Sequence, residues 1–145
     1  MNAAERMVLM DKEELSAFLA ETFPQVAGDF RLEHVAPMSV VVRLMVREKH
    51  LRPGGTVSGP SMFTLADVAM YLVLLAMIGP KGLAVTTNCS FDFLRKPVAG
   101  RDLIAEARLL KLGRVLAVGD VVMRSEHDTN IVARAGLTYS IPPER

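Results

Sequence analysis

One segment of this chain, residues 60–78, is apolar around nearly its whole circumference and is far longer than a typical strand. It reads PSMFTLADVAMYLVLLAMI. Because a proline stands in its first turn and Gly79-Pro80 follows it, the segment is predicted to be one helix. A helix that is hydrophobic on almost every side must be wrapped by other structure. The remainder of the chain therefore has to form a layer that encloses this helix.

The segments on either side of the central helix are typical of β-strands, because they are rich in valine and partly alternate apolar with polar positions. The connections between the later strands are short, as antiparallel neighbours require. The predicted order is two strands, the long helix and then four strands, so the fold class is α+β, with one curved antiparallel sheet around one helix. The predicted strands span residues 29–35, 39–47, 83–95, 102–111, 114–124 and 131–141.

A second, shorter helix is predicted near the N-terminus, at about residues 11–23, where acidic residues precede an amphipathic pattern. Pro24 and Gly28 are expected to end it, and we expect it to pack on the outside of the domain. No repeat or linker-like segment interrupts the chain, so residues 1–145 are predicted to form a single domain.

The composition argues against several classes of function. The chain has 17 basic and 16 acidic side chains, so it lacks the excess of positive charge that is typical of nucleic-acid-binding proteins. The three histidines are scattered and Cys89 is the only cysteine, so neither a metal-ligand spacing nor an internal disulfide is predicted. A single cysteine fits a reducing compartment, and we expect a cytoplasmic protein.

A membrane location is not expected either. The N-terminus shows no sustained apolar run behind a basic start, so no signal peptide is predicted. Within the central helix the uninterrupted apolar run covers residues 68–78, which is well short of the ~20 residues that span a bilayer.

Asp67 is the one carboxylate in the central helix, and it makes this segment a candidate for chemistry. An ionised carboxylate is costly to bury, by several kcal/mol or more, unless it is paired or used. Ser61, Thr64 and Tyr71 lie within ~120° of Asp67 on a helical wheel and form the only polar stripe. The lead-in Ser58-Gly59-Pro60 supplies a helix N-terminus, whose backbone N–H groups favour developing negative charge.

The spacing of these residues carries a resemblance to a known family. Ser58-Gly59-Pro60 and Thr64-Leu65-Ala66-Asp67 stand where hotdog-fold acyl-CoA thioesterases of the phenylacetyl-CoA thioesterase-like (PaaI-like) branch have a His-Gly-Gly turn and an Ala-Leu-Ala-Asp-like stretch. The resemblance covers roughly residues 39–141. It implies the hotdog fold, a curved antiparallel sheet wrapped around one long helix, with the N-terminal helix as an addition.

The resemblance also implies an arrangement of the site. It implies a homodimer or a dimer of dimers, with two active sites at the subunit interface and the strand at residues 83–95 paired with its twin. Asp67 would attack the thioester or activate water, and the Gly59 N–H of the other subunit would polarise the carbonyl. Coenzyme A, as part of the substrate, would have its phosphates near basic side chains such as Arg95 and Arg114. No metal or other cofactor is implied.

Three departures from the family pattern affect the site rather than the fold. Ser58 replaces the usual histidine. Pro60 replaces the second glycine and has no N–H to donate, although Gly59 keeps its own. Arg52 stands where many relatives have asparagine, and its cation could pair with Asp67 or bind substrate.

Each candidate residue also has a structural interpretation. Asp67 could be a structural acid that pairs with Arg52, and Ser58 could be only a helix cap. Thr64 and Tyr71 could hold the carboxylate, contact substrate or simply pack. The remaining candidates have simpler alternatives: Arg95 and Arg114 could be merely solvated, and Cys89 is expected to be a buried small apolar residue.

We therefore predict an acyl-CoA thioesterase that acts on a small-molecule substrate, with no nucleic-acid or membrane partner. The main alternative is a catalytically idle hotdog protein that binds acyl-CoA as a carrier or sensor. A hotdog enoyl-CoA hydratase or dehydratase ranks third, because those enzymes usually pair an acid with a histidine. A serine hydrolase is not predicted, because G-x-x-S-G around Ser58 is not the G-x-S-x-G elbow.

Overall fold

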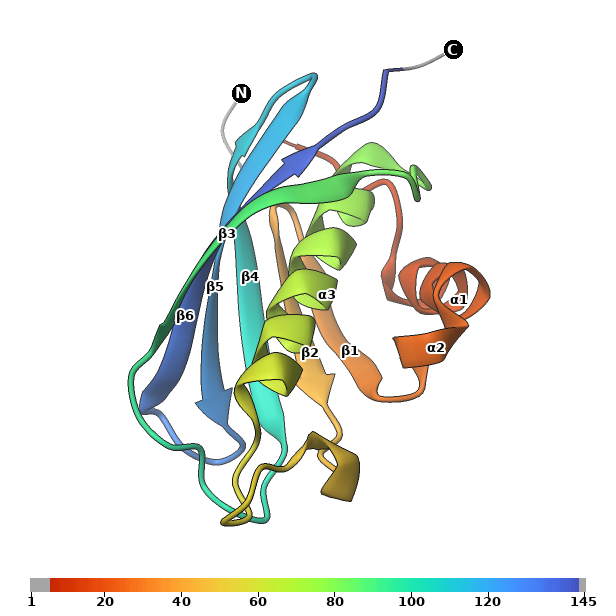
Figure 1. The fold of residues 1–145 in the computed structure, drawn as a ribbon. Helices are drawn as coiled ribbons and strands as arrows, with labels where there is room; N and C mark the ends of the chain where they lie inside the picture. The colour runs from red at the N-terminus through yellow and green to blue at the C-terminus, as the bar shows by residue number, and fades with distance from the viewer. Residues whose placement is uncertain (1–5, 144–145) are drawn as a thin grey trace.

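The computed structural model describes residues 6–143 and contains both the sheet and the long helix that the sequence predicts (Figure 1). The central helix α3 (Gly59–Ile78) lies against one face of a six-stranded antiparallel sheet that curves around it, in the strand order β1-β2-β4-β5-β6-β3. The predicted hotdog arrangement is thus confirmed. The strands are β1 (Phe30–Ala36), β2 (Ser39–Leu44), β3 (Val85–Phe93), β4 (Leu103–Leu112), β5 (Leu116–Ser125) and β6 (Ile131–Ser140).

Helix α3 begins and ends where the local sequence dictates. The Ser58 side chain caps its first turn by accepting a hydrogen bond from the Ser61 N–H at 3.3 Å, and Pro60 lies in that turn. Gly79 ends the helix with φ +88°, a conformation that side chains disfavour. By length and composition this helix could cross a membrane, but 67% of its most apolar window is buried inside the protein, as expected of a core helix.

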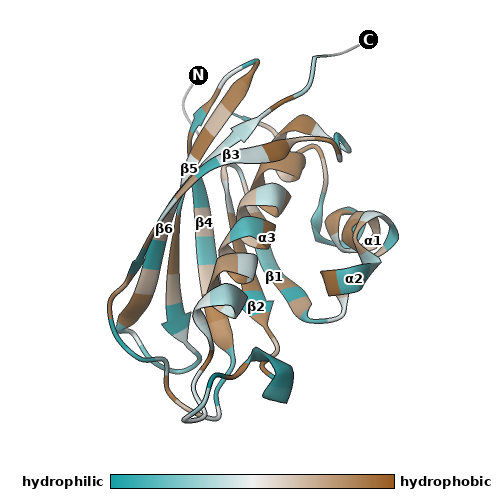
Figure 2. Ribbon diagram, viewed as in Figure 1, coloured by the Kyte–Doolittle hydropathy of each residue, from teal (hydrophilic) through white to brown (hydrophobic). Residues whose placement is uncertain are grey.

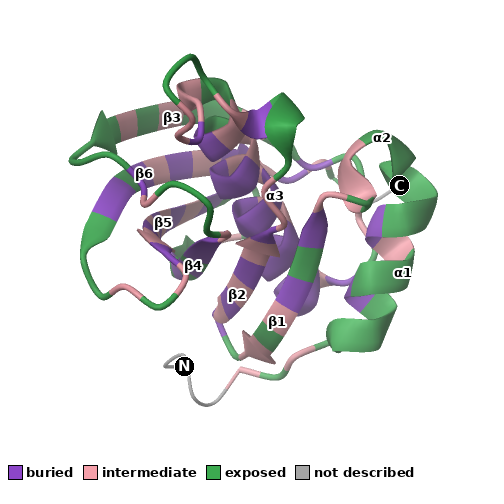
Figure 3. Ribbon diagram, turned by 90° about the horizontal axis from the view of Figure 1, so that it is seen from below, coloured by how far each residue is buried: buried purple, intermediate pink, exposed green. Residues whose placement is uncertain are grey.

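The core lies between α3 and the sheet. Figure 2 shows α3 as mostly hydrophobic, and buried residues alternate with more exposed ones along the central strands (Figure 3). Gly119 in β5 is closely packed, because a Cβ there would lie 2.6 Å from the Met70 sulfur and 2.8 Å from the Arg108 carbonyl oxygen in β4. A side chain at this position would therefore clash with the β4 backbone and displace Met70 of α3.

The N-terminal region differs in part from the prediction. Helix α1 (Lys12–Thr22) agrees with the expected helix, and its first turn carries a capping box between Asp11 and Glu14. Pro24, however, does not simply stop the chain: it opens a second short helix, α2 (Pro24–Ala27), because proline is well tolerated at a first helical position. The loop that precedes α3 likewise contains a short 3₁₀ helix, η2 (Glu48–His50).

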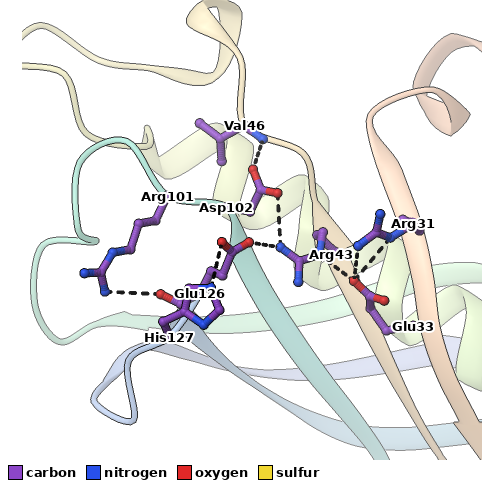
Figure 4. A network of polar contacts seen from close by, with 8 residues as sticks. All are labelled: Arg31, Glu33, Arg43, Val46, Arg101, Asp102, Glu126 and His127. Atoms are coloured by element: carbon purple, nitrogen blue, oxygen red, sulfur yellow. Dashed lines mark hydrogen bonds and ion pairs between the residues drawn. The ribbon is translucent and has the colours of Figure 1, made fainter.

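A cluster of charges joins the ends of several strands on the outer side of the sheet (Figure 4). The Arg43 guanidinium in β2 forms ion pairs with Glu33 in β1 and with Glu126, and it donates to Asp102 Oδ2 at 3.1 Å. The other oxygen of Asp102 accepts from the Val46 N–H at 2.9 Å. These hydrogen bonds from Arg43 lower the pKa of Glu33. The cluster therefore ties β1, β2 and the connection after β5 together.

Candidate active site

Asp67 is held by two hydroxyl groups from the far strands of the sheet. Its Oδ1 accepts hydrogen bonds from Thr86 Oγ1 in β3 at 2.5 Å and from the Tyr139 hydroxyl in β6 at 2.8 Å. The same tyrosine hydroxyl lies 3.2 Å from the main-chain oxygen of Asp67. No described residue donates to Oδ2, so this oxygen is the one left for chemistry.

The hydroxyl of Tyr139 donates to Asp67. Tyr139 is 3% exposed, and its burial together with the nearby charge of Asp67 raises the pKa of Tyr139 far above its ordinary value. The phenol is therefore protonated at neutral pH and keeps the proton that it donates.

Asp67 opens into a cavity of about 420 Å³. Tyr71, one turn further along α3, lines the same cavity, and its hydroxyl donates to the Gly82 carbonyl at 3.2 Å. The opposite wall comes from the corner between α1 and α2, where Thr22, Phe23 and Gln25 face the cavity. The N-terminal helix packs on the outside of the domain, as expected, and its C-terminal end also lines the cavity beside Asp67.

The first turn of α3 offers a free amide. Gly59 is the first helical residue, where no intrahelical acceptor exists, and its N–H has no acceptor among residues 6–143. The next residue is Pro60, which has no N–H, and the Ser61 N–H bonds to Ser58 Oγ. The Gly59 amide is thus the donor that remains at this helix terminus, where a developing negative charge is favoured.

Gly59 and Asp67 belong to different cavities of the same chain. Gly59 lines a second cavity of about 420 Å³, together with the three cations Arg52, Arg95 and Lys96. Asp67 stands eight positions after Gly59 in the helix, which is about 12 Å along the helix axis. One carbonyl group cannot reach both of them within a single chain. If the two residues serve one reaction, they must come from two copies of the chain.

The structure places the other candidate residues as follows. Arg52 lines the cavity of Gly59, and no ion pair joins it to Asp67 among the described residues of one chain. Thr64 donates to the Pro60 carbonyl at 3.0 Å, within its own helix, rather than to the carboxylate of Asp67.

The basic residues that the sequence placed near strand ends do not form one cluster. Arg95 lies near the N-terminus of α3, with Gly59, whereas Arg114 lines a cavity beside Ile78 at its C-terminus. A helix of 20 residues is about 30 Å long, so these two arginines lie at opposite ends of the molecule. Of these two arginines, only Arg95 lies beside Gly59 in the same chain.

Cys89 is half-buried on β3, not fully buried as predicted, because β3 is an edge strand that α3 covers only in part. Burial and the charge of Asp67 both raise the pKa of the Cys89 thiol, so it is not poised as a thiolate nucleophile. Within residues 6–143 no group of three or more His, Cys, Asp or Glu side chains is placed to hold a metal ion.

Two residues at the centre of the site were not singled out from the sequence. Thr86 and Tyr139 are direct partners in the β3–β6 ladder, and both face α3. The alternation of β6 could have placed Tyr139 on the inner face. The pairing of β3 with β6, which are separated by two other strands in the sequence, was not evident from the sequence.

Comparisons with known proteins support the fold. Residues 54–132 match the model of the thioesterase superfamily. Human acyl-coenzyme A thioesterase 13 is 28% identical over 116 residues, which are 79% of this chain and 81% of the human protein.

Among solved structures, a candidate thioesterase from Silicibacter sp. TM1040 is 56% identical to the chain, with a TM-score of 0.90; the match covers 98% of this chain and 97% of that chain. The PaaI protein from the phenylacetic acid degradation operon of E. coli is 21% identical, with a TM-score of 0.78 over 91% of this chain and 94% of its own, and shares the fold.

Proposed function

Because the chain belongs to the thioesterase superfamily, we propose that it hydrolyses an acyl-CoA thioester to a free acid and coenzyme A. The observation that carries this proposal is the environment of Asp67. Asp67 lines a cavity, has one oxygen anchored by two hydroxyl groups and accepts no hydrogen bond on the other from a described residue, so it is suited to act as nucleophile or general base.

The reaction needs Asp67 Oδ2 on one side of the carbonyl and a hydrogen-bond donor on the other. In the general-base form, Asp67 takes a proton from water, the water oxygen bonds to the carbonyl carbon, the C–S bond breaks and the thiolate of coenzyme A takes up the proton. The free Gly59 N–H would stabilise the oxyanion of the intermediate. Since Gly59 and Asp67 of one chain are about 12 Å apart along the helix, we propose that the active unit is a homodimer or a dimer of dimers.

Coenzyme A carries phosphate groups, and the cavity beside Gly59 is the place where the chain gathers cations. Arg52, Arg95 and Lys96 line that cavity together with apolar side chains. A phosphate group bound there would be joined to the thioester by the pantetheine arm of coenzyme A, which would lead from these cations to the carbonyl held by the Gly59 N–H. The acyl group would then extend toward Asp67 of the other chain, into the cavity closed by the corner between α1 and α2.

The test is release of free thiol from a panel of short-, medium-, long-chain and aryl acyl-CoAs, with the wild type and Asp67→Asn assayed side by side. We expect turnover by the wild type and a loss of 100-fold or more, on the order of 3 kcal/mol, in the variant. Unaltered melting temperatures of the two proteins would show that the variant is folded. Turnover that survives the substitution would refute the mechanism.

Two alternatives remain distinct in this experiment. Binding of acyl-CoA without turnover on any substrate would indicate a carrier or sensor. A hydratase would need a histidine near Asp67, and none of the described residues that line the Asp67 cavity is a histidine. The buried His50 is used elsewhere: its Nδ1 accepts from the Arg47 N–H at 2.9 Å, and its Nε2 lies 3.4 Å from Asp29 Oδ2.

A further inference from the structure

Tyr139 supplies the most buried of the polar groups around Asp67, and its role goes beyond the reaction described above. The residue lies on β6 in the core, yet its hydroxyl reaches the carboxylate on α3 at 2.8 Å and the main-chain oxygen of the same residue at 3.2 Å. A buried tyrosine hydroxyl needs a hydrogen-bond partner. Here that partner is the proposed catalytic group itself.

We propose that Tyr139 is a positioning residue, which together with Thr86 fixes the orientation of Asp67 so that Oδ2 faces the substrate. This inference rests on the proposed function. The Tyr139 hydroxyl itself does not need to touch the substrate for this role, because it acts through the carboxylate of Asp67.

The geometry supports positioning rather than simple core packing. Thr86 and Tyr139 are directly opposite each other in the β3–β6 ladder, so their hydroxyls converge on one oxygen from two strands. A carboxylate that is free to rotate would exchange its two oxygens, whereas two donors on Oδ1 resist that rotation. The ring of Tyr71 lies 6.4 Å from the ring of Tyr139 and packs beside it, which limits how far the phenol can move.

The test is Tyr139→Phe, which removes the hydroxyl and keeps the ring. We expect kcat to fall about 10- to 100-fold, because a misplaced catalytic group loses alignment rather than substrate affinity. KM should stay within about twofold, and the melting temperature should change by only a few degrees. A purely structural role would lower stability without this separation of kcat from KM.

Thr86 provides an independent pair of variants on the edge strand. Thr86→Val removes the second donor and should reproduce the selective loss of kcat, whereas Thr86→Ser keeps a hydroxyl and should restore most of it. This pair keeps the inference testable if Tyr139→Phe proves unstable. A loss of kcat in Thr86→Ser as large as in Thr86→Val would contradict the role of the hydroxyl.

Asp67→Asn separates failure of this inference from failure of the proposed function. If Asp67→Asn is inactive while Tyr139→Phe keeps the wild-type kcat, the proposed function stands and the positioning role is overturned. A raised KM with unchanged kcat in Tyr139→Phe would also overturn it, because the hydroxyl would then serve binding. If Asp67→Asn itself retains full activity, the proposed function fails first.

Discussion

Substitution of Gly59 by proline should remove one hydrogen-bond donor from the proposed active site. Gly59 is the first residue of α3, the helical position at which proline is most favoured. The preceding residue, Ser58, has φ −75° and ψ 156°, the extended conformation that proline imposes on its neighbour. Pro60 in turn disfavours the helical conformation for any residue with a Cβ at position 59, a cost that proline and alanine share there, whereas only proline removes the amide proton that is free in the wild type.

The expected magnitude follows from the role of that amide. Removal of one oxyanion donor typically costs about 10²–10³ in kcat, or roughly 2.7–4 kcal/mol. The steric cost is separate: a Cβ at position 59 would lie 3.3 Å from Cζ of Phe93. Phe93 is 57% exposed in a single chain, but the proposed pairing of β3 with its twin would cover its ring, so this steric cost has to be measured with a control variant.

Gly59→Ala is the matched control, because it adds the same Cβ beside Phe93 and keeps the N–H. Both variants would be assayed for kcat and KM on the best acyl-CoA, with thermal unfolding followed in parallel. We expect Gly59→Pro to lose 10²–10³ in kcat, and Gly59→Ala to lose far less. Equal losses in the two variants would assign the effect to crowding at Phe93 and refute the role of the amide.

Three further predictions concern assembly, stability and specificity. Co-expressed Asp67→Asn and Gly59→Pro chains should regain about one quarter of the wild-type activity, since random pairing gives half mixed dimers with one intact site each; activity no higher than in the separate variants would refute shared sites. Arg43→Met should lower the free energy of unfolding by about 2 kcal/mol and the melting temperature by roughly 6 °C at pH 7, since it removes the cation that Glu33, Asp102 and Glu126 share. Arg43 lowers the pKa of Glu33 from 4.5, so this contribution is present above pH 4.5 and is lost as the pH falls through the lowered value; a deficit in urea unfolding that persists at lower pH would contradict it. Phe23→Ala should shift the preference toward acyl-CoAs with longer acyl chains, because Phe23 lines the Asp67 cavity. If the variant ranks the acyl-CoA panel as the wild type does, Phe23 does not determine chain-length specificity.

The fold could be predicted because its strongest determinants are local. The start and end of α3 follow from the Ser58 cap and from Gly79. Because the helix is apolar around almost its whole circumference, it has to be enclosed by other structure, which the sheet provides. Asp67 could be singled out because a lone carboxylate in such a helix needs a use or a partner. The identity of that partner could not be predicted. Arg52 looked suitable by charge, but the loop carries it toward Gly59 instead.

The rest of the site depends on strand order and on chain path, which local patterns do not encode. Thr86 meets Tyr139 only because β3 crosses over to pair with β6 at the edge of the sheet. The corner at Phe23 reaches the cavity only because the chain turns between α1 and α2. The contact between Thr86 and Tyr139 and the position of Phe23 at the cavity can therefore be recognised only in the complete fold.

The edge position of β3 links the incomplete site to the proposed dimer. Edge strands expose unpaired backbone groups and are usually protected, yet β3 is exposed along most of its length (Figure 3). Phe91 and Phe93 on this strand have ring centroids 4.7 Å apart, and Phe63 on α3, itself 43% exposed, lies 6.4 Å from Phe91. An exposed aromatic cluster beside Gly59 is costly unless another surface covers it. Pairing of β3 with its twin in a second copy would cover these rings and bring a second Asp67 toward Gly59. One contact would then both pair the free backbone groups of the edge strand and complete the proposed active site.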